Sequence, residues 1–339
     1  MPRLVAAPDK FKGSATAADL AAAACAAATA AGWECDRVPV ADGGEGTLEV
    51  LGGPNRRTEV TGPLGTPVQA EWRLDGDTAV VEMARASGLV LAGGARGNDP
   101  LEATTRGTGE LVLAAVGAGA RRVVVAVGGS ATTDGGLGAV DVLAGRLAGV
   151  EVVVACDVET RFCDAAPDFA PQKGATPAQV ELLRRRLERL VGDYRRRFGV
   201  DVGELAGAGA AGGLAGGLAA IGARLVPGFD LVAEAVGLEE RLDGADLAVT
   251  GEGFVDEESF HGKVVGGMAR LCAEAGVRLV VVAGEVYDAP ADLETVSLTA
   301  RFGSERSHAD PLGCVREVVL GVLTAAGGAG APPGGGAGA

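Results

Sequence analysis

The stretch from Arg122 to Gly136 decides the fold, and it reads RVVVAVGGSATTDGG. Its first half is a continuous apolar, β-branched run, which is typical of a parallel strand that is covered on both faces. Its second half is a loop rich in glycine and hydroxyl groups that begins where the strand ends. In open α/β sheets, ligands bind at the carboxyl ends of the strands, so this unit predicts both a fold class and the place of a site.

Strand and helix patterns alternate along the rest of the chain, which indicates an α/β architecture. Helices are predicted at 16–31, 108–116 and 264–275, and Thr176 followed by Pro177 marks the start of the clearest helix. The segment Thr66–Asp77, with a turn at Asp75-Gly76, predicts a hairpin with Thr78–Met83 and therefore a mixed sheet in the middle of the chain. The other predicted strands are Arg3–Ala7, Arg37–Val40, Val150–Ala155, Asp246–Thr250 and Arg278–Ala283.

Composition excludes several classes of protein. The length of 339 residues predicts about two domains, and a hydrophobic content of 47% excludes overall disorder. A net charge of −15 argues against sequence-independent binding to nucleic acid. Two histidines leave little material for histidine-based zinc sites or for a Ser-His-Asp triad. Six cysteines without a C-x-x-C pair are expected to be buried reduced thiols of a cytosolic protein: Cys25, Cys35, Cys156, Cys163, Cys272 and Cys314.

Targeting and membrane signals are weak. The N-terminus reaches Asp9 and Lys10 too early for the apolar core of a signal peptide. The uncharged stretch Ala206–Ala223 consists mostly of glycine and alanine, so its hydrophobic drive into a bilayer is small. We therefore predict a cytoplasmic protein with no membrane partner. The last residues are only glycine, alanine and proline, and a disordered tail is expected at 326–339.

Glycine-rich polar loops follow four of the predicted strands, and at least one carboxylate, lysine or hydroxyl lies in each. Because the carboxyl ends of parallel strands share one edge of a sheet, these loops are expected to meet in one crevice. Glycine allows backbone N–H groups to approach a phosphate closely. Only four lysines occur in the chain, and all lie near a glycine, as expected where a compact positive charge is needed: Lys10, Lys12, Lys173 and Lys263. The four loops are Pro8–Ser14, Ala41–Thr47, Gly128–Gly136 and Gly251–Lys263.

Anion-binding loops, lysines and carboxylates together are the parts of a phosphoryl-transfer site. The chain has no Walker A sequence, since Val264 follows Gly262-Lys263, and it lacks the protein-kinase signatures. A G-x-G-x-x-G pattern at Gly207, Gly209 and Gly212 supports an alternative, an NAD-dependent oxidoreductase of a small hydroxy acid.

The loops and several further segments resemble the type 1 glycerate kinases, in the same order and over nearly the whole chain. The motifs that carry the resemblance are Ala7–Ser14, Pro39–Thr47, Val60–Gly65, Thr104–Glu110, Gly128–Gly136, Ala155–Val158, Pro171–Ala175, Gly207–Gly213 and Gly251–Lys263.

The resemblance implies ATP-dependent phosphorylation of D-glycerate with Mg²⁺ in the cytoplasm. The chain is expected to be a monomer or homodimer, and the sequence leaves open which of the two. The resemblance also implies a discontinuous Rossmann-like domain with a parallel sheet (1–60 plus 230–325), an inserted mixed α/β domain (61–229) and an active site in the cleft between the two. Whether the 2- or the 3-hydroxyl of glycerate accepts the phosphate stays open.

Candidate site residues follow from the loops and the resemblance together. The catalytic candidates are Asp42, Asp134, Asp256, Lys10 and Lys263, and the three aspartates are also the candidate Mg²⁺ ligands, with no roles assigned among them. The candidates for binding substrate or nucleotide are Lys12, Ser14, Glu45, Arg106, Thr108, Gly128, Gly129, Ser130, Thr132, Asp157, Gln172, Lys173, Gly209, Gly212, Gly213 and Glu252.

The chain departs from the family pattern in its middle. The family has several tens more residues in the interval that Leu137–Val154 fills here, and Glu159–Cys163 replaces an Asn-Pro-Leu-type segment. The motif loops are retained, so an active enzyme is expected, and the alternatives are a changed substrate pocket and a catalytically impaired ligand-binding member of the family.

Overall fold

The computed structural model describes residues 1–260 and 263–328, which form two compact units. Unit 1 combines Met1–Val40 with the chain from Val236 onward, and unit 2 is Ala41–Ala235. The first division falls earlier in the chain than the expected position 60, because β3 (Arg56–Thr61) is a strand of the unit 2 sheet.

Unit 1 is built on a five-stranded sheet in which every neighbouring pair is parallel. Its order is β13-β11-β9-β1-β2, so the chain moves outward from β1 in one direction and from β9 in the other. The point between β1 and β9 is therefore the topological switch point of a doubly wound sheet. The strands are β1 (Arg3–Ala6), β2 (Glu34–Arg37), β9 (Leu247–Thr250), β11 (Arg278–Ala283) and β13 (Glu294–Ser297).

Helices α1 and α15 pack against each other and share a core cluster with the strands of this sheet. Thr16 caps α1, as the sequence predicted for its start. The helices of unit 1 are α1 (Ala17–Ala30), α11 (Leu238–Leu242), η2 (Glu257–Phe260), α12 (Val264–Ala275), α13 (Leu298–Phe302), α14 (Ser304–Ala309) and α15 (Pro311–Gly328). A small pair of strands, β10 (Phe254–Val255) and β12 (Glu285–Val286), completes the described part of the unit.

Three expectations about unit 1 need correction. Cys25 on α1 and Cys35 on β2 form a disulfide, with 5.4 Å between their Cα atoms, so these two cysteines are not the reduced thiols that were predicted. The predicted strand Arg37–Val40 is displaced, because the regular strand is β2 (Glu34–Arg37). After it, the N–H groups of Val38 and Val40 donate to the carbonyl oxygens of Ala6 and Pro8. The predicted tail begins inside α15, and its residues 329–339 lie outside the described part of the chain.

Unit 2 contains a mixed sheet of order β3-β4-β5-β6-β7-β8. The pairs from β3 to β5 are antiparallel and those from β5 to β8 are parallel. The predicted hairpin with its turn at Asp75-Gly76 is confirmed, and Gly76 has a φ of +57°. The strands after β3 are β4 (Pro67–Asp75), β5 (Thr78–Glu82), β6 (Arg122–Ala126), β7 (Glu151–Cys156) and β8 (Arg224–Pro227).

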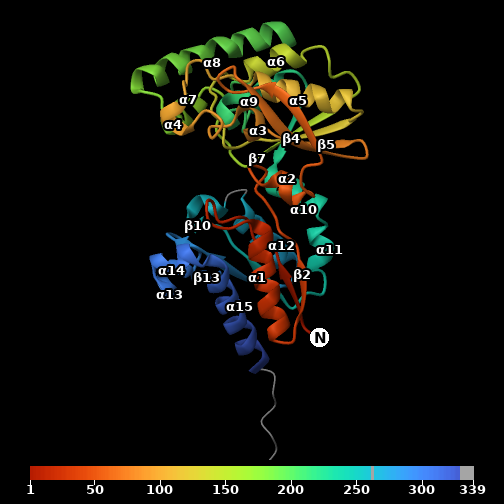
Figure 1. The fold of residues 1–339 in the computed structure, drawn as a ribbon, viewed down its shortest axis with the longest axis vertical. Helices are drawn as coiled ribbons and strands as arrows, with labels where there is room; N and C mark the ends of the chain where they lie inside the picture. Colours follow the sequence, from red (N-terminus) through yellow and green to blue (C-terminus); the bar gives the residue numbers. More distant parts are fainter. Residues whose placement is uncertain (261–262, 329–339) are drawn as a thin grey trace, which may run out of the picture. The chain divides into compact units, whose positions relative to one another are not determined.

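Five of the helices of unit 2 lie beside this sheet in two layers. Apolar side chains of α5, α6 and α9 share a buried cluster with β5, β6 and β7, and α8 packs outside them with α7 in a second cluster (Figure 1). Thr176 and Gln179 form a capping box at the start of α8. The helices are α2 (Thr47–Val50), α3 (Ala84–Ser87), α4 (Gly94–Gly97), α5 (Arg106–Gly117), α6 (Leu137–Leu143), α7 (Ala165–Phe169), η1 (Pro171–Lys173), α8 (Pro177–Phe198), α9 (Ala210–Ala220) and α10 (Gly228–Ala235).

The uncharged stretch 206–223 contains α9, which is interrupted at Ala211–Gly213 by left-handed backbone. Across the described ranges, no helix combines the length and apolar character needed to cross a bilayer.

Candidate active site

In unit 1, two of the predicted loops lie side by side at the switch point. The loop after β1 and the loop after β9 are joined by the bond from Asp9 N to Gly251 O, 2.8 Å long. A Cβ atom on Gly253 would lie 3.5 Å from the backbone nitrogen of Lys12. Lys10, Lys12, Ser14 and Glu252 are therefore brought to one edge of the sheet, which is where α/β sheets of this topology bind ligands.

The other candidates of unit 1 lie further along the second loop. The carboxylate of Asp256 accepts hydrogen bonds from the backbone N–H and the hydroxyl of Ser259. Lys263 occupies the residue before α12. Between them lie η2 and the dipeptide His261-Gly262, and the dipeptide lies outside the described residues.

In unit 2, the loop 41–47 packs against the loop 128–134. A Cβ on Gly128 would lie 3.2 Å from the Cα of Gly44, and a Cβ on Gly129 would lie 2.5 Å from Oε1 of Glu45. Oδ1 of Asp42 accepts the backbone N–H of Gly44 at 3.0 Å. The structure thus brings Asp42, Glu45, Gly128 and Gly129 together, as the sequence predicted for their loops, and the absence of a Cβ at Gly128 and Gly129 allows this close approach.

A buried hydroxyl lies in the same place. Thr47, the first residue of α2, has no exposed surface, and its Oγ1 has no hydrogen-bond partner within the described ranges of the chain. Asp157 lies just after the end of β7, at the carboxyl edge of the same sheet.

Lys173 is buried in unit 2 with 4% of its surface exposed. Its Nζ donates to Oγ of Ser130 at 2.8 Å and to the carbonyl oxygen of Thr132 at 2.6 Å. Burial lowers the pKa of this amine to about 7, although the charge of Asp134 acts in the opposite direction. The amine therefore holds the loop 128–134 in place.

Asp134 is a partly buried carboxylate that accepts hydrogen bonds from backbone N–H groups. Its Oδ2 accepts the N–H and the hydroxyl of Thr105 at 2.9 and 2.8 Å and the N–H of Gly138 at 3.2 Å, and Oδ1 accepts the N–H of Gly136 at 3.0 Å. Burial raises the pKa of this carboxyl group, while these hydrogen bonds act to lower it. With these donors, Asp134 ties the starts of α5 and α6 to its loop.

Several other candidates make packing contacts. Thr108 is buried and bonds to Oγ of Ser87 at 2.9 Å, and Arg106 is exposed and pairs with Glu110 on the same helix. A Cβ on Gly212 would lie 1.9 Å from the carbonyl oxygen of Thr132, so the loop 209–213 packs directly on the loop 128–136. Of the remaining candidates, Gln172 is exposed and Thr132 is buried. Gly209 packs against the backbone of Arg161, and Gly213 packs against the backbone of Gly135.

This packing removes the basis of the oxidoreductase alternative. A dinucleotide-binding G-x-G-x-x-G needs a strand immediately before it and a regular helix after it. Here Gly207 follows a loop after α8, and Gly212 has left-handed backbone. The pattern is a packing motif in this chain.

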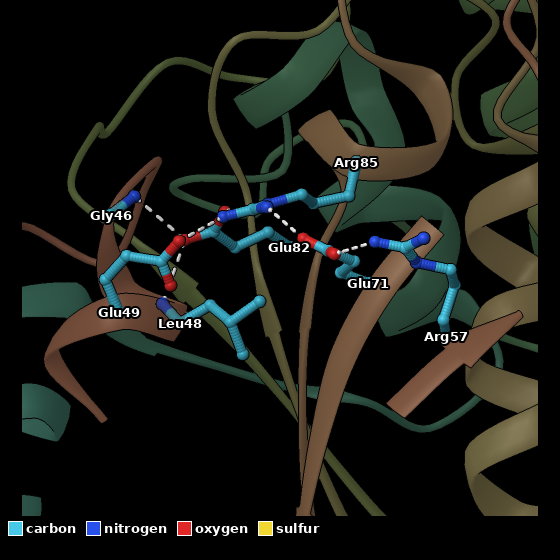
Figure 2. A network of polar contacts seen from close by, with 7 residues as sticks. All are labelled: Gly46, Leu48, Glu49, Arg57, Glu71, Glu82 and Arg85. Atoms are coloured by element: carbon cyan, nitrogen blue, oxygen red, sulfur yellow. Dashed lines mark hydrogen bonds and ion pairs between the residues drawn. The ribbon is translucent and has the colours of Figure 1, made fainter. Parts of the chain in front are cut away.

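The sequence analysis missed a charged cluster beside the loop 41–47. Glu82, the last residue of β5, is 3% exposed and accepts the N–H groups of Gly46 and Leu48 at 2.8 and 2.9 Å. Arg85 pairs with Glu82 at 3.2 Å (Figure 2). The signal available in the sequence was Glu82, a carboxylate near the end of the otherwise largely apolar run Thr78–Met83.

Unit 2 also contains a cavity of about 560 Å³ between α6, α8 and the segment 100–106. Arg106 and Asp134 line it, and no residue of the loop 41–47 does. In the described ranges, no group of three or more acidic, histidine or cysteine side chains is arranged to hold a metal ion.

Comparison with known proteins agrees with this geometry. A model described as the glycerate kinase family matches residues 4–148 and 139–317. Glycerate 2-kinase of Escherichia coli is 38% identical over 328 residues, covering 84% of this chain and 86% of that protein. Glycerate kinase of Bacillus subtilis is 38% identical over 326 residues, with 84% and 85% covered. An uncharacterized protein of Mycobacterium bovis is 42% identical over 306 residues, with 84% and 79% covered.

A solved structure shows the same fold. The crystal structure of a protein described as a candidate glycerate kinase 2 from Salmonella typhimurium matches with a TM-score of 0.82 and 33% identity, covering 97% of this chain and 99% of that one.

Proposed function

This chain belongs to the glycerate kinase family, and from that premise we propose that it transfers the γ-phosphoryl group of ATP to D-glycerate. The observation that carries the proposal is the position of the glycine-rich loops. In unit 1 the lysine-bearing loop 8–14 and the loop that starts at Gly251 follow the parallel strands β1 and β9, and in unit 2 the loop that starts at Gly128 follows β6 and contacts the carboxylate-bearing loop 41–47.

Unit 1 supplies groups suited to a polyphosphate. Lys10 and Lys12 follow β1 at the switch point, where a nucleotide is expected in a doubly wound sheet. We assign these two lysines to the phosphates of ATP, with Lys263 as a third positive charge. In a protein of net charge −15, such a local concentration of lysines is needed to attract two anionic substrates.

Unit 2 supplies carboxylates. Asp42 and Glu45 share one short loop, and hard oxygen ligands of this kind fit Mg²⁺, which keeps several waters and binds one or two carboxylates together with substrate phosphates. When bound, the ion neutralises charge on the phosphates. We assign Asp42 and Glu45 to this role because the two carboxylates lie in one short loop, whereas Asp134 accepts hydrogen bonds from Thr105, Gly136 and Gly138.

The reaction needs a hydroxyl oxygen of glycerate to attack the γ-phosphorus. The new oxygen–phosphorus bond forms as the bond to the β,γ-bridging oxygen breaks, ADP departs, and the hydroxyl proton passes to a carboxylate or to water. A carboxylate that orients the hydroxyl and positive charges that stabilise the transferred group are the two contributions that such a site makes. Asp42 is our candidate for the first, and the lysines of unit 1 are candidates for the second.

Lys173 and Asp134 act through the backbone in this proposal. Lys173 holds Ser130 and Thr132, and Asp134 holds the starts of two helices. Both are positioning residues of the loop 128–136.

The shortened middle of the chain bears on substrate choice. The alignment with the Escherichia coli protein spans 328 positions, but only 84% of the 339 residues of this chain take part in it. The remaining positions are gaps in this chain, so the relative has additional residues within the matched range. The two matches to the family model overlap at 139–148, inside the interval where the sequence predicted a deletion. The deletion adjoins the cavity near α6 and leaves the loop 41–47 unchanged, so we expect glycerate to remain a substrate.

A coupled assay of ADP release tests the proposal. The protein is incubated with MgATP and, separately, D-glycerate, L-glycerate, lactate and tartronate. ADP release that requires D-glycerate supports the proposal. Binding of glycerate without ADP release would identify an impaired family member, and release that is independent of any acid would refute glycerate as the acceptor.

One substitution and a matched control sharpen the assay. Asp42→Asn is expected to lower kcat by about 100-fold or more, as loss of a carboxylate at the reacting group does. Asp168→Asn removes an exposed carboxylate from α7 and serves as the control. Equal rates for the two variants would remove Asp42 from the mechanism.

A further inference from the structure

The carboxylate of Glu82 is buried at the place where β5 ends. A buried carboxylate is costly unless its oxygens are hydrogen-bonded and its charge is paired. Both conditions are met here: Oε1 accepts the N–H groups of Gly46 and Leu48, and Oε2 faces Nε of Arg85 at 3.2 Å. The group is therefore satisfied by the loop 41–47 on one side and by a single arginine on the other.

One N–H group belongs to Gly46, at the end of the loop that holds Asp42 and Glu45, and the other to Leu48, in the first turn of α2. Gly46 has a φ of +94°, and α2 begins at the next residue. The helix has only four residues, which is too short to be stable by itself. An external acceptor for N–H groups at its start therefore helps to fix where the loop ends.

Arg85 connects this anchor to the rest of the sheet. Its three guanidinium nitrogens reach three carboxylates on three elements: Glu82 on β5, Glu71 on β4 at 3.1 Å and Glu49 on α2 at 2.5 Å (Figure 2). Glu71 is also bonded by Arg57 of β3. The planar, rigid fork of arginine makes such a three-way contact, which a lysine does not reproduce.

We propose that Glu82 and Arg85 are positioning residues that fix the loop 41–47, and so set the placement of Asp42 and Glu45 for phosphoryl transfer. The inference rests on the proposed function and deepens it. Neither side chain is assigned a contact with substrate. A displacement of reacting groups by about 1 Å can cost on the order of 100-fold in rate, so an anchor of this kind affects turnover strongly.

Glu82→Met is the direct test, because it keeps a similar side-chain size and removes both the oxygen that accepts the two N–H groups and the charge that Arg85 faces. Arg85→Lys is the second variant, since it keeps the positive charge and removes the fork, and it serves if Glu82→Met does not fold. Glu151→Met is the matched control: Glu151 lies at the start of β7, is exposed, and pairs with Arg224 at 3.0 Å.

Two readouts are needed. Hydrogen exchange measured on the full chain without ligand reports whether the amides of residues 46–48 lose protection. Steady-state kinetics with D-glycerate and MgATP report the consequence: kcat is expected to fall about 10- to 100-fold. The KM for ATP should change less, because the lysines of unit 1 are untouched. The control should resemble the unmodified protein in both readouts.

The outcomes separate the inference from the function on which it rests. Loss of protection at 46–48 together with a fall in kcat supports the inference. Unchanged protection refutes the anchoring, and lost protection with unchanged kcat refutes its role in positioning. If the unmodified protein makes no phosphoglycerate, the proposed function fails and the positioning role fails with it, while the exchange data still decide whether Glu82 and Arg85 anchor the loop.

Discussion

Replacing Lys173 by methionine removes a buried ammonium group from unit 2, and the structure predicts how the free energy of unfolding will then depend on pH. Burial lowers the pKa of Lys173 from 10.5 to about 7. Between these two values the unfolded chain keeps a proton that the folded protein has released. Unfolding therefore takes up a proton, and the free energy of unfolding rises with pH through this window.

The magnitude follows from the same two values. Well inside the window, each pH unit adds about 1.4 kcal/mol. At pH 7 only half of that slope applies, so raising the pH from 7 to 9 should stabilise the protein by about 2 kcal/mol relative to Lys173→Met. Below pH 6 the amine is protonated in both states, and the difference between the two proteins should become nearly constant.

Urea unfolding at several pH values measures this difference. In a Trp33→Phe background, Trp72 is the remaining tryptophan, and it lies buried on β4 of unit 2. Burial raises the pKa of the Cys156 thiol to about 11, which destabilises the fold at high pH, but this contribution is common to both proteins and cancels.

Arg189→Met is the control, since it removes an exposed positive charge from α8. It should reproduce the pH dependence of the unmodified protein. The same pH dependence in Lys173→Met and the unmodified protein would refute the burial of an amine with a lowered pKa.

Three further predictions follow from close contacts. Asp134→Asn replaces acceptors by an amide that faces backbone donors, and we expect a loss of about 2–3 kcal/mol in the free energy of unfolding, whereas unchanged stability would contradict the hydrogen-bond pattern. Gly212→Ala places a Cβ 1.9 Å from the carbonyl oxygen of Thr132 and should lower the free energy of unfolding by about 3 kcal/mol or more. Gly222→Ala is its control, because Gly222 has a positive φ but open space around it, and we expect a loss of about 1 kcal/mol. Similar losses in the two variants would show that the contact at Gly212 relaxes. The disulfide between Cys25 and Cys35 predicts four titratable thiols in the denatured, unreduced protein and six after reduction; six thiols before reduction would show that the bond does not form.

The parts of the fold that the sequence predicted well are those with local signals. The apolar run 122–127, the hairpin turn at Asp75-Gly76 and the capping box at Thr176 each specify structure within a few residues. The strand predicted at Arg37–Val40 was misplaced because the strand that forms in this region, β2 (Glu34–Arg37), is a half-exposed edge strand without an apolar run.

The site was predictable at the level of loops and less so at the level of side chains. Glycine-rich loops after strands indicated which segments would lie at the sheet edges, and Asp42 and Glu45 lie there. The contacts of Lys173 and Glu82 join residues more than thirty positions apart, so no local pattern reveals them. The same holds for Asp134, whose position in a conspicuous loop suggested catalysis while its partners are backbone N–H groups.

Identification of the phosphorylated product tests the central claim most directly. ³¹P NMR of the protein incubated with MgATP and D-glycerate should show the phosphate resonances of ATP replaced by those of ADP and of a single phosphoglycerate, whose coupling to carbon-bound protons tells whether the 2- or the 3-hydroxyl was used. We expect one phosphoglycerate in amounts equal to the ADP formed. ADP accompanied only by inorganic phosphate, or no loss of ATP at all, would refute the proposed function.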